Sequence, residues 1–438
     1  FTAGVVFGWP GLVTVLTKDG VYESLCPKGQ PHCPDRSAKL HLVFNMGATG
    51  NYLSNVPFGW LLDTYGPRTS SLVASAGFGL GILLCLDEAF LPYGFFLLGF
   101  TGPGIQLATL HLSNMFPDKQ STLLGASTSC FDAGAIVFLG FKVVHDSFDV
   151  KAHDLFTGFL LVPAFVFLTA LAFWPRHAFR LTEIEIAESP GGRNQPRFGA
   201  LPFKEMIRTQ LFWFLCAFAT IHICRLNFIV GTMHEQLLHT LPDDKADELT
   251  TTFSSMLPFG FVVFPVYGWL TDNHGPITAF QTVTAVGVAY GAAMLIRGST
   301  VALIIVFMLV AVSRQMVYSC VFSMIAKEFG FVHLGKLSGL INIFVACGGA
   351  VNFGLSLAAL YLMDGEYFAV NTIVLLFALP LLGAPYWLSG NRNEQTPMNA
   401  EGGERRPLMG IGGEISRPKF EAEEKPDPGT WEQSGRFA

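Results

Sequence analysis

FGWLLDTYGPR, from Phe58 to Arg68, nearly recurs as YGWLTDNHGP, from Tyr267 to Pro276, which begins 209 residues later in a chain of 438 residues. Each copy ends one apolar, helix-length run and opens the next. In each copy an Asp stands in a tight turn whose glycines permit backbone angles that other residues resist. The recurrence predicts a protein made of two related halves.

The composition is typical of a membrane protein. Hydrophobic residues make up 51% of the chain, charged residues 14%, and the mean hydropathy is +0.44, whereas a soluble domain carries about 25% charge. The net charge of −6 comes without a basic patch, and the eight Cys residues show no zinc spacing. The sequence therefore predicts no nucleic-acid partner, no cofactor or metal, and no enzyme.

Apolar runs set the expected architecture, because a hydrocarbon core about 30 Å thick needs about 20 apolar residues per helix. The twelve runs are 1–17, 38–62, 69–87, 91–114, 122–145, 154–174, 209–235, 249–271, 277–297, 300–323, 337–361 and 367–388. We expect an all-α membrane protein with pseudo-twofold symmetry: a six-helix half at 1–174, a linker at 175–208, a second six-helix half at 209–388 and a disordered tail at 389–438. Because Phe1 lies inside the first run, we expect helix 1 to lack its start.

The distribution of Lys and Arg predicts the orientation. The linker is rich in them, and the loops on its side add Arg68, Lys119, Lys327 and Lys336. The linker and both termini should therefore face the cytoplasm, in a plasma membrane or a vacuolar or lysosomal membrane.

Three smaller features carry expectations of their own. Small residues in steps of three or four, as in Gly77 with Gly81 and Gly99 with Gly102, allow close helix packing, with neutral drift as the alternative. Cys26 and Cys33 share a loop on the outer side, where a disulfide is favoured over two free thiols. In the tail, Glu404, Leu408 and Met409 resemble an acidic dileucine signal for a sorting adaptor, a pattern that also arises by chance.

The repeated turn resembles the loop signature of the major facilitator superfamily. The resemblance implies its twelve-helix fold and alternating access. Asp63 and Asp272 would accept hydrogen bonds from a helix N-terminus and hold the inner gate closed in one state. Arg68 would pair with a carboxylate or a phospholipid, and Ile277 replaces it in the second copy. The gating set comprises Gly59, Asp63, Gly66, Arg68, Gly268, Asp272, Gly275 and Arg314.

Further stretches resemble solute carrier family 43. They are FGWPGLVTVLTKDGVYESLCP (Phe7 to Pro27), SNMF and STLLG (within Ser113 to Gly125), CRLNFIVGT (Cys224 to Thr232), VSRQMVYS (Val312 to Ser319), HLGKLSGL (His333 to Leu340) and GEYFAVN (Gly365 to Asn371). That family includes transporters of large neutral amino acids and a nucleobase transporter. The resemblance implies sodium-independent facilitated diffusion of a small solute.

Ionisable residues inside the apolar runs are candidates for the substrate site, because each costs at least ~2.5–3.5 kcal/mol to place at bilayer depth. Arg225 is the leading candidate: its guanidinium can clamp a carboxylate with two hydrogen bonds, and His222 shares its helix face. The resemblance adds that amino-acid-transporting members tend to have Arg-Leu at this point. The alternative is a structural tie from Arg225 to Asp132 or to a backbone carbonyl.

The remaining candidates have more than one interpretation. Arg314 forms a polar face with Tyr318 and is expected to have a gating or a structural role. His222 can bind substrate, carry a proton or merely pack. Asp132 resembles the nucleobase member and can bind the substrate ammonium, pair with Arg225 or bind a proton. Asn51 and Asn55 share a face that points to the cavity or makes interhelical bonds. Asn227 lies nearly opposite Arg225 on its helix and is interpreted as packing.

The preferred function is a uniporter for large neutral amino acids. A nucleobase facilitator, a proton-coupled symporter and a non-transporting nutrient sensor are the alternatives.

Overall fold

The structure is a computed structural model that describes residues 2–28, 32–111, 130–175, 198–199, 201–330 and 333–383, and these contain helices and connections but no strand. The α-helices are α1 (Trp9–Lys18), α2 (Pro34–Leu53), α3 (Asn55–Leu84), α4 (Leu91–His111), α6 (Ile136–Phe148), α7 (Ala152–Phe159), α8 (Leu161–Phe173), α10 (Phe203–Met206), α11 (Gln210–Thr240), α12 (Asp243–Met256), α13 (Phe264–Met294), α14 (Thr300–Met324), α15 (Leu334–Leu362) and α16 (Phe368–Leu376). Short 3-10 segments precede α1 (Val5–Gly8, η1), follow α12 (Leu257–Val263) and follow α16 (Leu379–Leu382).

Several of these helices can cross a membrane. Five meet the length and hydropathy of a span, namely Ala152–Phe173, Gln210–Thr240, Ile277–Met294, Thr300–Phe329 and Gly335–Leu362. The bent pair Asp243–Gly260 and Pro265–Thr271 makes a sixth. The all-helical membrane architecture is confirmed. The count of twelve stays a prediction, because other expected spans are shorter or only partly described.

Each repeated turn joins two helices through one glycine. Gly66 lies inside α3 with φ 83° and ψ 171°, and Gly275 lies inside α13 with φ 79° and ψ 177°. This backbone region is essentially restricted to glycine. The sequence therefore placed both turns correctly. Gly330, after the π-helical end of α14 (Ile325–Phe329), has the same geometry with φ 84° and ψ 171°.

The spaced glycines lie where helices touch. A Cβ on Gly99 would stand 1.9 Å from the carbonyl oxygen of Gly47, so the backbones of α4 and α2 are in direct contact. A Cβ on Gly81 would stand 3.0 Å from the carbonyl of Gly94, and one on Gly77 would stand 2.7 Å from Thr101. The close-packing role of these small residues is confirmed.

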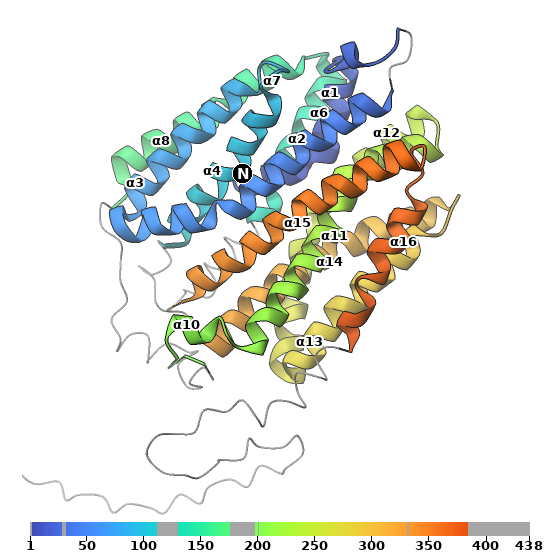
Figure 1. The fold of residues 1–438 in the computed structure, drawn as a ribbon. Helices are drawn as coiled ribbons and strands as arrows, with labels where there is room; N and C mark the ends of the chain where they lie inside the picture. The colour runs from blue at the N-terminus through green and yellow to red at the C-terminus, as the bar shows by residue number, and fades with distance from the viewer. Residues whose placement is uncertain are drawn as a thin grey trace, which may run out of the picture. The chain divides into compact units, whose positions relative to one another are not determined.

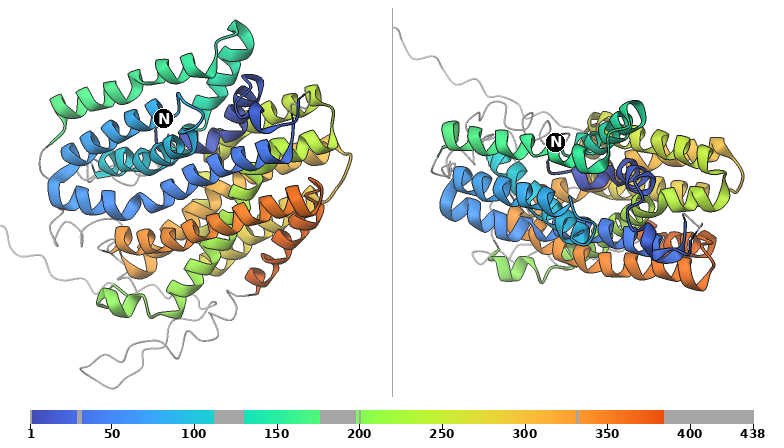
Figure 2. Two further views of the ribbon diagram at one scale, coloured as in Figure 1. Left: turned by 45° about the horizontal axis from the view of Figure 1, so that its top comes forward. Right: turned by 90° about the horizontal axis from the view of Figure 1, so that it is seen from above.

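Helices from the two expected halves lie side by side within the unit Phe1–Gly390. Figure 1 shows α15 between α2 and α11, and the two views of Figure 2 keep α2 beside α15. At one end, α1 and α11 finish and α2 and α12 begin. We call this the loop end, and we call the end that carries Gly66, Gly275 and Gly330 the turn end.

The loop end contains the expected disulfide, between Cys26 and Cys33, whose Cα atoms are 5.6 Å apart. The two cysteines are seven positions apart in the sequence, and Cys33 directly precedes Pro34, the first residue of α2. The predicted tail, with Glu404, Leu408 and Met409, lies outside the described residues, as does most of the linker. The division into two six-helix halves stays a prediction.

Candidate functional site

A buried ion pair joins the two expected halves. Nε of Arg314, on α14, lies 3.2 Å from Oδ1 of Asp132, in the helical segment just before α6, and both side chains are about 95% buried. Among the described residues, no hydrogen-bond partner is present for the three guanidinium nitrogens of Arg314. The pair therefore combines a cationic fork with unused donors and a carboxylate close beside it.

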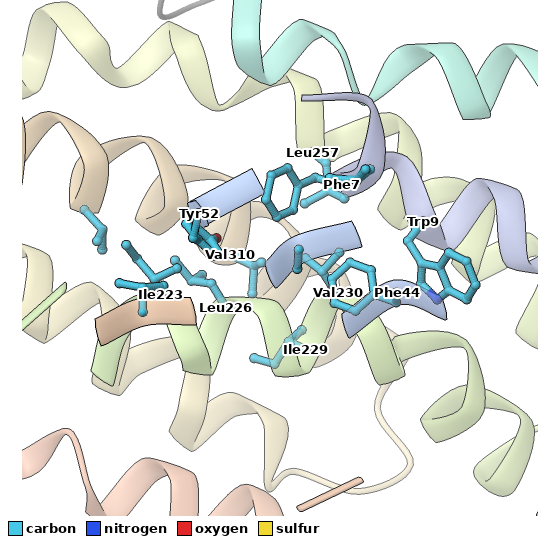
Figure 3. Packing of buried hydrophobic residues seen from close by; sticks show 14 of the residues in the cluster. Phe7, Trp9, Phe44, Tyr52, Ile223, Leu226, Ile229, Val230, Leu257 and Val310 are labelled. Carbon is cyan, nitrogen blue, oxygen red and sulfur yellow. The ribbon is translucent and has the colours of Figure 1, made fainter. Parts of the chain in front are cut away.

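Aromatic rings cover this pair. The Phe7 ring, from η1, has its centroid 4.1 Å from Cζ of Arg314, and the Phe131 ring lies at 5.8 Å. Figure 3 shows Phe7 and Tyr52 close together above the aliphatic side chains of α11, among them Leu226. Rings over a guanidinium stabilise its charge where water is absent. The surroundings therefore favour a desolvated polar site.

A hydroxyl and amide bridge lies next to the pair. The hydroxyl of Tyr52, on α2, is 2.8 Å from the hydroxyl of Tyr318, on α14. Nδ2 of Asn227, on α11, donates to the Tyr52 hydroxyl over 3.0 Å. The Arg314–Tyr318 face expected from the sequence thus contacts the other half. Asn227 contributes a hydrogen bond to this bridge, so its structural role is more specific than the packing that the sequence suggested.

The side chain of Arg225 contacts α13, within its own half. Its Nη2 donates to the carbonyl of Gly287 over 2.7 Å, and its Cζ lies 4.9 Å from the centroid of the Tyr290 ring. Both partners belong to α13, in the same half as α11. The structure thus records the backbone tie that was the structural alternative, and it pairs Asp132 with Arg314 rather than with Arg225. A substrate role for Arg225 stays a prediction.

The other predicted substrate residues make contacts within the protein. Nε2 of His222 is 3.3 Å from the hydroxyl of Thr284, on α13, and its ring lies 4.6 Å from the Phe218 ring. Nδ2 of Asn51 donates to the carbonyl of Ala3 over 3.0 Å, which is the interhelical alternative. Asn55, at the start of α3, is half-buried.

The gating residues are described in part. The side chains of Asp63 and Asp272 lie outside the described ones. Arg68 donates to the carbonyl of Leu171, near the end of α8. Its pairing with a carboxylate or a phospholipid stays a prediction. The free carbonyls at the C-terminus of a helix carry partial negative charge and attract a cation. Arg68 thereby joins α3 to α8 within the first half.

A second charged cluster joins the halves at the loop end. Nζ of Lys18 lies 2.9 Å from Asp247, on α12, and 3.0 Å from Asp146, on α6. Lys142, also on α6, is 97% buried and lies 3.6 Å from Asp146 and 3.9 Å from Asp247. The four charges balance. Sequence reasoning missed Lys142, although an ionisable residue inside the run 122–145 was a usable signal.

Hydrogen bonding keeps this cluster charged. Lys18 and Asp146 lie just beyond the expected spans. Burial lowers the pKa of Lys18, but its bonds to Asp247 and Asp146 outweigh that effect and raise the pKa above its ordinary value. Burial likewise opposes ionisation of Asp146, but the Lys18 ammonium beside it holds its pKa below the usual range. Both groups therefore stay ionised at mildly acidic pH.

More polar contacts cross between the halves at the same end. Tyr361, on α15, donates to Asp35, on α2, over 2.5 Å. Glu235, on α11, interacts with Ser37 and Arg36, on α2. These contacts and the ion pairs hold the loop end closed in this structure.

Known proteins resemble this chain over shares of its length between 42% and 86%. Residues 36–353 match the family model of the Major Facilitator Superfamily. Protein FMP42 of Saccharomyces cerevisiae is 26% identical over 417 residues, which cover 78% of this chain and 82% of the relative. Equilibrative nucleobase transporter 1 of Bos taurus is 21% identical over 458 residues, covering 86% and 91%. Large neutral amino acids transporter small subunit 3 of Mus musculus is 30% identical over 203 residues, covering 42% of this chain and 36% of that relative's length.

Proposed function

Because this chain belongs to the Major Facilitator Superfamily, we propose that it carries large neutral amino acids across its membrane by sodium-independent facilitated diffusion. That it is a membrane transporter follows from the family and from the apolar helices. The solute and the absence of coupling are our proposal.

The observation that carries the proposal is the buried pair Arg314–Asp132. An α-amino acid presents one carboxylate and one ammonium on neighbouring atoms. Within the part of the chain that the structure describes, the guanidinium fork of Arg314 has nitrogens without a hydrogen-bond partner, which suits bidentate binding of the carboxylate. Asp132, 3.2 Å away, suits the ammonium. The two groups neutralise each other when the site is empty, so neither charge stands alone in the membrane.

Alternating access supports the same assignment. The pair and the Tyr52–Tyr318 bridge lie between elements of both halves, and the loop end is closed by contacts across the halves. A ligand that bridges Arg314 and Asp132 would bind both halves and change their relative stability in the two states. The disulfide favours an oxidising, non-cytosolic side for the loop end. The turn end would then face the cytoplasm, as the Lys and Arg distribution predicts.

A nucleobase facilitator is the second candidate. It is favoured by the similarity to the bovine nucleobase transporter, which extends over 86% of this chain. In that case Asp132 would accept hydrogen bonds from a purine edge, and the Phe7 ring would stack on the base.

Uptake into proteoliposomes tests the proposal. A panel of labelled leucine, phenylalanine, methionine and adenine is measured with and without sodium. We expect saturable leucine and phenylalanine uptake that is unchanged without sodium, and poor competition by leucine amide and leucinol, which lack the carboxylate. Strong adenine uptake without amino acid uptake would replace the proposal with the second candidate.

A further inference from the structure

Two buried histidines lie on helices of the two different halves near the loop end. His41 lies on α2 and is 98% buried. Both of its ring nitrogens lack a hydrogen-bond partner among the described residues. His234, on α11, is 96% buried, and its Nδ1 lies 3.1 Å from the hydroxyl of Thr250, on α12. The two rings are close enough to interact electrostatically.

We propose that His41, with His234, forms a proton-binding site, and that proton binding favours the state of the transporter that is open at the loop end. The proposal rests on the alternating-access part of the proposed function and is independent of the identity of the solute.

The charge balance of the closed loop end supports this coupling. Lys18 and Lys142 are offset by Asp146 and Asp247 when both imidazoles are neutral. A proton on His41 would add a positive charge that, among the described residues, has no carboxylate in contact and no acceptor for either N–H group. In an open state, water would solvate the imidazolium. The open state therefore binds the proton more tightly, and acid shifts the population towards it.

The groups around the pair come from several elements. The titratable and charged groups that act on His234 are Lys18 on α1, Lys142 on α6, Asp247 on α12 and His32 before α2. His41 is acted on by His234, whereas the described side chains of α4 and α15, which also pack on α2, contribute no such interaction. Lys18 and Asp146 stay ionised in mild acid, whereas an imidazole that water reaches titrates at about pH 6.5. His41 and His234 are therefore expected to gain charge in mild acid when the loop end opens.

Hydrogen exchange of the purified full chain tests the proposal without any solute. Exchange is measured by mass spectrometry at about pH 7.5 and about pH 5.5, a range that covers imidazole titration. The rates are corrected for the intrinsic exchange rate of an unprotected amide at each pH. We expect peptides from the end of α1 and the start of α12 to exchange faster in acid. Each unit by which the histidine pKa differs between the open and the closed state shifts the ratio of open to closed molecules by up to about tenfold.

Matched variants identify the titrating group. His41→Gln should remove the acid effect, whereas His153→Gln, an exposed histidine at the same end, should leave it intact. His41→Asn serves as a second variant if His41→Gln does not fold. An acid effect that persists in the His41 variants, or a wild-type protein without one, overturns the proposal. Neither result depends on the solute, so the proposed transport function is tested separately by uptake.

Discussion

At the scale of residues, the two arginines of the interior have different partners. Arg314 has nitrogens without hydrogen-bond partners among the described residues and a carboxylate on the other half, whereas Arg225 donates to the carbonyl of Gly287 within its own half. Removing a hydrogen bond to a charged group costs about 1.5–3 kcal/mol. We therefore expect Arg314→Met to weaken the apparent affinity for leucine about tenfold to a hundredfold.

Arg314→Lys should rescue only part of this loss, because Lys lacks the planar fork. Arg225→Met is the matched control, measured in the same proteoliposome assay after normalising for folded protein. It should reduce stability more than affinity. The opposite pattern, with affinity lost in Arg225→Met and kept in Arg314→Met, would make Arg225 the carboxylate clamp.

Sequence reasoning found the charged members of the site but not how they pair. Asp132, Arg314 and Tyr318 were identified because ionisable and polar groups are costly inside apolar runs and therefore indicate a function there. The helical angle between Asn227 and Arg225 was also correct, since a separation of two residues turns the helix by about 200°. The angle could not show which of the two sides faces the other half. That depends on how α11 packs against α2, which the sequence of α11 alone does not contain.

At the scale of elements, the repeated turn requires glycine because of its backbone dihedral angles and not because a side chain would clash there. A Cβ would meet no atom within 4 Å at either Gly268 or Gly275, but only Gly275 has a positive φ, of 79°. Gly275→Ala should therefore lower stability by about 1–3 kcal/mol. Gly268→Ala, in the helical part of α13 before the turn, should be nearly neutral. Thermal unfolding in detergent compares the two variants, and equal melting temperatures would contradict this account.

The carboxylate of the first turn gives a second prediction at this scale. Asp63→Asn should lower maximal uptake more than surface expression, because the residue is expected to bias the energy gap between the two states. Asp272→Asn should have a smaller effect, since Ile277 stands where the first copy has Arg68. Unchanged maximal uptake at normal expression would count against a gating role for Asp63.

At the scale of the whole molecule, the loop end is closed by charges that belong to different halves. Asp247 and Asp146 contact the same two lysines, but only Asp247 lies on the opposite half. Asp247→Asn should therefore loosen the closure, speed hydrogen exchange at the end of α1 and lower maximal uptake. Asp146→Asn, which changes a pair within one half, should have a smaller effect on exchange. Similar exchange in both variants would show that the closure does not depend on the charge of Asp247, which pairs with lysines of the other half.

The backbone conformation of Gly66 and Gly275 also occurs outside the repeated sequence. The sequence around Gly330 does not resemble the repeated motif, yet its φ and ψ angles lie within a few degrees of those of Gly66. A dihedral angle that only glycine adopts readily can thus be required where no neighbouring side chain is shared. A single residue therefore specifies this bend, and a search for further bends of the kind should score a lone glycine between two apolar runs, and not the residues around it.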